Sequence, residues 1–101
     1  MNTHDGFLVK VLKSPLFSEG MSIEFHSDGK YLFAVLNYRH KPGEQQIDTW
    51  FLSALSGIGL SPDEAAYDLI KQANRKTIVF GAFGEHRYVY TPDFDEFLNE
   101  A

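Results

Sequence analysis

Apolar positions recur along most of the chain, and their spacing predicts strands near the N-terminus. Residues 7–12, FLVKVL, are apolar with one polar interruption, which is typical of a strand. Two further strand-like runs, within residues 21–40, flank Asp28 and Gly29. Because glycine readily adopts the positive φ of a tight turn, this pair predicts a β-hairpin.

The apolar spacing then changes from a strand period to a helical one. A stripe with spacing i, i+3, i+4, i+7 and i+8 consists of Ile47, Trp50, Phe51, Ala54 and Leu55. It predicts a helix over residues 47–56, with Gly57 as its C-cap. The segment 47–52 is also rich in strand formers, so a strand there is the alternative interpretation.

A second helix is predicted directly after the glycine-rich segment. Ser61, Pro62 and Glu64 have the spacing of a capping box, in which the serine accepts a hydrogen bond from the third helical amide. A stripe of small and medium apolar residues follows: Ala65, Ala66, Leu69, Ile70 and Ala73. A phosphate-binding loop is disfavoured here, because Asp63 and Glu64 would repel the anion. The segment therefore predicts a turn between two helices.

The C-terminal third predicts another hairpin and a short helix. Residues 77–91 are strand-like and turn near Gly84, and Thr91-Pro92-Asp93 begins the helix. Taken together, the pattern predicts a single α+β domain over residues 1–101. We expect a mainly antiparallel sheet of about five strands, the element order βββααββα, and helices packed mostly on one face.

Composition narrows the possible functions. Nine basic and fourteen acidic residues give a net charge of −5, which disfavours direct nucleic-acid binding. No apolar run reaches the ~18 residues of a membrane span, so we expect no membrane contact. The absence of cysteine excludes disulfides and suits a cytoplasmic location. The four histidines lack the spacing of a metal site, and we expect neither a metal nor another cofactor.

One set of residue types fits catalysis. Glu85, His86 and Arg87 in the second hairpin, together with His40 after the first, are the types that a small metal-independent ribonuclease uses. They would converge if the two hairpins were neighbours in one sheet. Such an enzyme usually carries a basic groove, and the acidic chain disfavours one, so this is the alternative hypothesis. A DNA-binding regulator is the third hypothesis. It is disfavoured because Asp63 and Glu64, in the first turn of the second predicted helix, would face the DNA.

Binding of another protein is the function that the sequence favours. Residues 91–101 contain four acids and no base, Asp93, Asp95, Glu96 and Glu100, and such a run is either a solvated face or a site for a basic partner. Tyr38 and Tyr88 lie on predicted strands, where exposed tyrosines would form a contact surface. We therefore expect a small non-catalytic protein of the inhibitor, immunity or phage and plasmid anti-defence type. Its partner would carry a basic surface, and a homodimer is compatible with the sequence.

Overall fold

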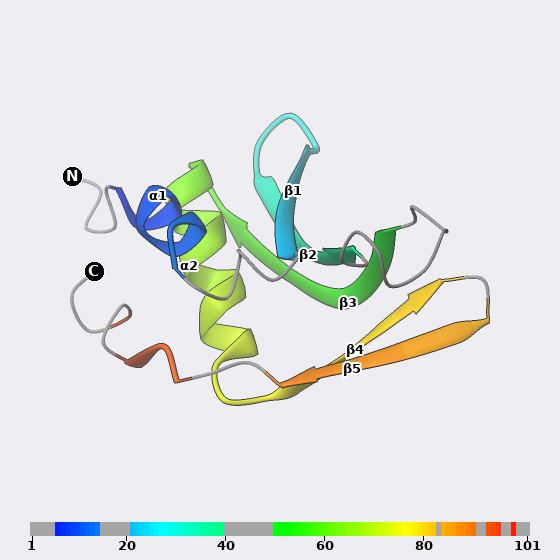
Figure 1. Cartoon of the computed structure of the whole chain (residues 1–101). Helices are drawn as coiled ribbons and strands as arrows, with labels where there is room; N and C mark the ends of the chain where they lie inside the picture. The colour runs from blue at the N-terminus through cyan, green and yellow to red at the C-terminus, as the bar shows by residue number, and fades with distance from the viewer. Residues whose placement is uncertain are drawn as a thin grey trace.

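The computed structural model describes residues 6–14, 21–39, 50–82, 84–90, 93–95 and 98. Its elements follow in the order α1 (Phe7–Leu12), β1 (Met21–Ser27), β2 (Leu32–Arg39), β3 (Trp50–Gly59), α2 (Pro62–Ala73), β4 (Thr77–Ala82) and β5 (Glu85–Tyr90) (Figure 1). The strands form one sheet in the order β1-β2-β3-β4-β5, and all neighbours are antiparallel. The α+β class and the antiparallel sheet are thus confirmed.

The predicted order of elements is wrong at two places. Residues 7–12 form helix α1 rather than a strand, and residues 50–59 form strand β3 rather than a helix. The strands of the sheet are therefore not the set that the sequence predicted. Most of the predicted C-terminal helix lies outside the described residues, although the Leu98 N–H donates a helical hydrogen bond to the Phe94 carbonyl at 3.0 Å.

Helix α1 is stabilised by α2, which buries its apolar side chains and provides the N-terminal cap that its own sequence lacks. Phe7 and Val11, one helical turn apart, are buried in a cluster with residues of α2. Gly6 offers no capping side chain. The carboxylate of Asp63 in α2 instead accepts hydrogen bonds from the N–H groups of Gly6 (3.1 Å) and Leu8 (2.9 Å). A residue on another element thus caps the helix, and no local sequence pattern reveals it.

Strand β3 lies at the centre of the sheet and contains an irregularity opposite β2. The register between the two strands shifts between Val35 and Asn37 of β2. At this point the Ser53 hydroxyl donates to the Leu36 carbonyl (2.7 Å) and accepts from the Leu55 N–H (3.3 Å). The serine side chain therefore satisfies backbone groups beside the shift, as expected for a bulge.

Two glycines allow α2 to pack directly on β3. A Cβ at Gly57 would lie 2.3 Å from both the Ala65 carbonyl oxygen and the Leu69 nitrogen, and one at Gly59 would lie 2.6 Å from the Ala65 nitrogen. Gly57 is therefore a packing position and not the predicted C-cap. The capping role of Ser61 is confirmed, because its hydroxyl accepts from the Glu64 N–H at 3.2 Å.

Side chains of α2 also bind the backbone of β3 where β4 moves away. In the described residues, β3 pairs with β4 at Leu52–Gly81 and Ser53–Phe80. Further along β3, the Asp68 carboxylate accepts from the Ile58 N–H (2.9 Å), and the Gln72 amide donates to the Ser56 carbonyl (2.8 Å). The helix thus occupies an edge that would otherwise present open backbone groups.

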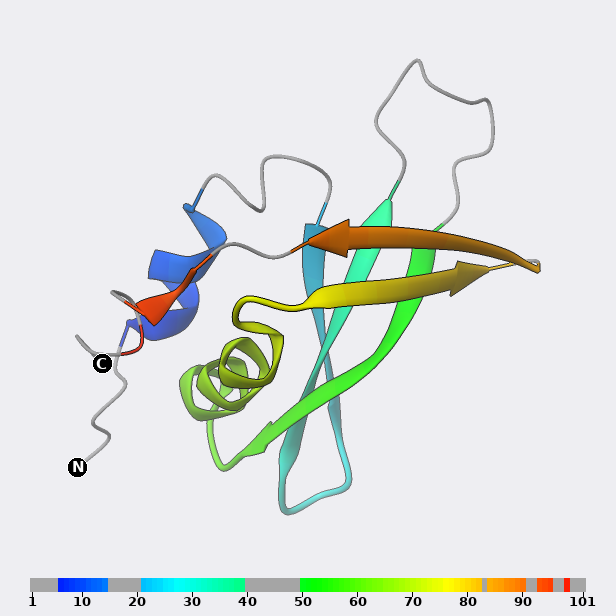
Figure 2. The ribbon, with the colours of Figure 1, turned by 90° about the horizontal axis from the view of Figure 1, so that it is seen from below.

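Helix α2 contributes to two buried clusters. The first lies between α2 and the sheet and contains Met21, Ala34, Leu36, Ala65, Leu69, Ala73, Ile78 and Phe80. The second joins α2 to α1 and the C-terminal segment and contains Phe7, Val11, Ala66, Ile70 and Phe94. Figures 1 and 2 show α1 and the C-terminal segment at the same end of the molecule as α2, while the β4–β5 hairpin extends toward the other end. No helix in the described part of the chain is long and apolar enough to cross a membrane.

Candidate functional site

The face of β2 and β3 that points away from α2 carries apolar side chains. Ala34 and Leu36 belong to the cluster beneath α2, so Phe33 and Val35, which alternate with them, lie on the opposite face. Phe33 is paired with Ile58 of β3, and both Phe33 and Val35 are half-buried. We call Phe33, Val35 and Ile58 the open face.

The apolar surface continues at the turn between β3 and α2. Leu60 is 73% exposed and Ile58 is 46% exposed, and two such side chains close together form an exposed apolar patch. Both line a hollow together with Gly59, Ser61 and Glu64. We call these five residues the turn patch: an apolar hollow with one carboxylate among the residues that line it.

The backbone of the turn patch is held on both sides. The Ile58 N–H is bound by Asp68, and Ser61 caps α2 immediately after Leu60. The patch was not predicted, because the sequence pattern placed residues 57–61 in a turn between two helices. The available signal was the presence of two large apolar side chains, Ile58 and Leu60, among glycines and serines, where a solvated turn would have polar residues.

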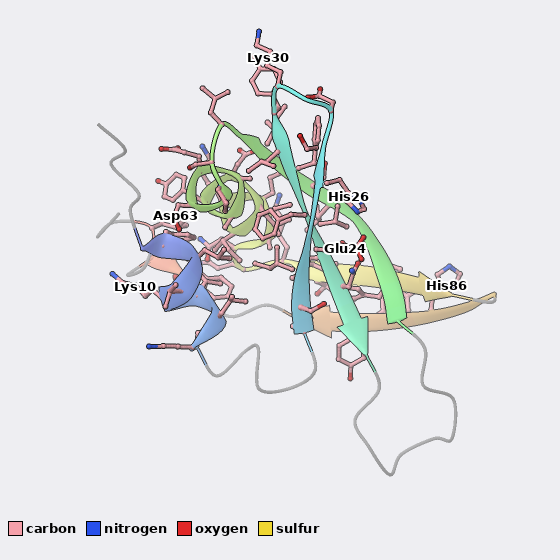
Figure 3. All side chains as sticks on the ribbon, turned by 90° about the horizontal axis from the view of Figure 1, so that it is seen from above. Lys10, Glu24, His26, Lys30, Asp63 and His86 are labelled. Atoms are coloured by element: carbon pink, nitrogen blue, oxygen red, sulfur yellow. The ribbon has the colours of Figure 1, made fainter. Side chains whose placement is uncertain are left out.

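A polar pair on β1 borders the open face. His26 is paired with Phe33 across the strands, and its Nε2 atom lies 2.5 Å from Oε2 of Glu24. Figure 3 shows both side chains pointing away from α2. Two ligands alone make a poor metal site, and the described residues contain no group of three or more potential metal ligands.

The carboxylate of Asp28 is bound by backbone N–H groups of the β1–β2 turn. Its Oδ1 atom accepts from the N–H groups of Tyr31 (2.8 Å) and Lys30 (2.9 Å), and Gly29 has a φ of 97°. These backbone hydrogen bonds, the one from Tyr31 most strongly, hold the pKa of Asp28 below its ordinary value. The predicted Asp-Gly turn is confirmed.

Two of the predicted partner-binding acids contact the turn that follows α2. Arg75 binds the carboxylates of both Asp93, at 3.2 Å, and Asp95. The Asn74 amide donates to Asp95 (2.8 Å), while its carbonyl oxygen accepts from the Phe94 N–H (2.6 Å). Asp93 and Asp95 therefore anchor the C-terminal segment to the end of α2.

These contacts shift the pKa of the groups involved. The Asp95 N–H, donating to Asp93 Oδ1 at 2.8 Å, is the main cause that lowers the pKa of Asp93, and Arg75 lowers it further. The hydrogen bond to Asp93 in turn raises the pKa of Arg75. Glu96 and Glu100 lie outside the described residues, so binding of a partner by the four acids remains a prediction.

The two predicted contact tyrosines lie on opposite sides of the sheet. Tyr38 is half-buried on the α2 side, with its ring centroid 5.7 Å from that of Phe80. Tyr88 is 70% exposed and is paired with Val79, which alternates with the buried Ile78 and Phe80. Of the two, Tyr88 is therefore the more exposed to a partner.

The predicted catalytic residues are not gathered on one face. His86 is exposed and paired with Gly81, while positions 85 and 87 alternate with it along β5 and belong to the other face. His40 lies outside the described residues. Figure 3 shows His86 near the end of the β4–β5 hairpin, away from Glu24 and His26. This alternation disfavours a common site for Glu85, His86 and Arg87.

Comparison with known proteins yields no relative on which to base a function. No protein-family model matches the chain, and no significant match was found among the curated proteins or the solved structures.

Proposed function

We propose that the chain is a non-catalytic binding protein that docks another protein on its turn patch. The observation that supports this is the exposure of Leu60 and Ile58 around a single hollow. Leaving two large aliphatic side chains in water has a cost that a binding surface explains. Because Asp68 and Ser61 hold the adjoining backbone, little conformational entropy would be lost on binding.

The chemistry of the patch suggests the kind of partner. An apolar side chain would fill the hollow, and a basic group beside it would meet Glu64. The net charge of −5 would also speed encounter with a basic protein surface. This fits a small inhibitor, immunity or anti-defence protein, and its lack of cysteine fits a cytoplasmic location.

A matched pair of variants tests the proposal. Leu60→Ser removes the most exposed side chain of the patch, whereas Val9→Ser changes a side chain on α1 that is 55% exposed and outside the patch. A partner would first be captured with the wild-type chain from its native host and then purified. We expect Leu60→Ser to weaken its binding about tenfold or more, and Val9→Ser to leave it unchanged. Equal dissociation constants for wild type and Leu60→Ser would exclude the turn patch as the site.

A further inference from the structure

A second hollow lies where β3 and β4 separate. In the described residues their pairing ends at Ser53–Phe80, and Figure 2 shows the two strands diverging toward α2. Three residues of β3, 53–55, lie at this point opposite the single residue Leu36 of β2. The bulge accounts for the separation, because a bulged strand bends away from its neighbour.

The walls of this hollow are mostly aliphatic. Continuing the β3–β4 register would place Leu55 opposite Ile78. Both line the hollow, together with Lys76, Thr77 and Val79. Ile78 belongs to the buried cluster beneath α2 and Leu55 packs against that cluster, whereas Val79 is 45% exposed. We call these five residues the seam hollow: a space of about 240 Å³ between the exposed surface of β4 and the core.

Both walls of the seam hollow are held in place. β5 pairs with residues 77–79 on the far side of β4, and the Gln72 amide binds the Ser56 carbonyl on β3. An inserted strand could not pair with both walls, because Gln72 already occupies that carbonyl of β3. The volume instead suits a small molecule. It exceeds the roughly 150 Å³ of a cavity that holds benzene, and it is below the roughly 300 Å³ at which pockets for drug-sized ligands begin.

The polar members of the seam hollow indicate the chemistry of its ligand. Lys76, which is exposed, is the one charged residue among the five, and it stands next to Thr77 at the beginning of β4. A carboxylate beside them would meet a positive charge and a hydroxyl donor. An aliphatic chain attached to it would displace water from Ile78 and Val79.

We propose that the seam hollow binds a small aliphatic carboxylate, a fatty acid of about eight carbons. The site shares no residue with the turn patch. It is therefore a second binding function of the chain, and it does not depend on the proposed docking of a protein partner.

Titration of the ¹⁵N-labelled full chain with octanoate and with octanol tests the site. We expect saturable shifts in the amide signals of residues 76–79, and not in those of residues 58–61. Octanoate should bind about threefold tighter than octanol at low salt, because an exposed ion pair contributes modestly, and added salt should remove the difference. If octanoate gives no saturable shifts, or shifts only residues 58–61, the proposal is wrong.

A pair of lysine variants tests the recognition of the carboxylate. Lys76→Met keeps most of the aliphatic stem and removes the charge, so octanoate and octanol should then bind equally. Lys13→Met removes a charge from an exposed position on α1 and should keep the threefold preference. A preference for octanoate that survives in Lys76→Met would contradict the role of this lysine.

A second pair of variants tests the place of the aliphatic chain. Val79→Trp puts a larger side chain at the exposed wall and should weaken both ligands about tenfold, whereas Val9→Trp, on α1, should leave them unchanged. The amide spectrum of each variant shows whether the fold is retained. Unaltered binding to folded Val79→Trp would overturn the site. Leu60→Ser should bind octanoate like the wild type, so this proposal and that of the turn patch can fail separately.

Discussion

At the scale of single residues, several aspartates of this acidic chain accept hydrogen bonds within the fold. The sequence predicted the local contacts: Ser61 caps the helix that follows it, and Asp28 belongs to the Asp-Gly turn. It did not predict Asp63 or Asp68, because the groups they bind lie 57, 55 and 10 residues away. The acids of residues 91–101 have no base beside them in the sequence, whereas Arg75 reaches Asp93 and Asp95 from the end of α2.

The hydrogen bond from the Asp95 N–H to Asp93, together with the contact to Arg75, predicts a dependence of stability on pH. The folded state lowers the pKa of Asp93, so its carboxylate adds stability at pH values above the pKa of the unfolded chain, about 3.9. That contribution is lost as the pH falls through the lower, folded pKa. We therefore expect Asp93→Asn to destabilise the protein equally at pH 7 and pH 5, and less at pH 3. Urea midpoints at the three pH values measure this, and a difference that grows in acid would contradict it.

At the scale of elements, two segments show where periodicity is insufficient. Apolar side chains on both faces of β3 removed the alternation that identifies a half-buried strand, and what remained resembled a helical stripe. In α1, β-branched residues favoured a strand, but burial of Phe7 and Val11 against α2 and the cap from Asp63 outweigh that preference. In contrast, the strands of both predicted hairpins and helix α2 were recognised, because their turn and cap signals are local.

The contact between α2 and β3 can be tested at Gly57. A methyl group at this position would collide with backbone atoms of Ala65 and Leu69, which cannot move without displacing the helix. We expect Gly57→Ala to lower the free energy of unfolding by about 1–3 kcal/mol or more. Ser56→Ala, at the exposed neighbouring position, keeps the carbonyl that Gln72 binds. This variant should change the free energy of unfolding by less than ~0.5 kcal/mol. Equal denaturant midpoints for the two variants would show that the helix adjusts.

At the scale of the whole molecule, α2 joins the sheet to the α1 and C-terminal segments. Its Leu69 belongs to the cluster on the sheet, and its Ile70 to the cluster with Phe7 and Phe94. The stripe of residues 65–73 predicted that this helix is buried, but not that two separate clusters share it. The candidate site was not predicted for a related reason. Ile58 and Leu60 become a patch only when β3 is a strand that leads directly into α2.

The two clusters should differ in how mutations combine. Val11, Phe94 and Phe80 are all fully buried or nearly so, and Val11 shares a cluster with Phe94 but not with Phe80. Residues that share a cavity are coupled, whereas separated residues act independently. For Val11→Ala combined with Phe94→Leu, we expect an interaction energy of about 0.5 kcal/mol or more from urea unfolding. For Val11→Ala combined with Phe80→Leu, the effects should add within ~0.5 kcal/mol. Equal interaction energies for the two pairs of mutations would mean that α2 does not separate the two clusters energetically.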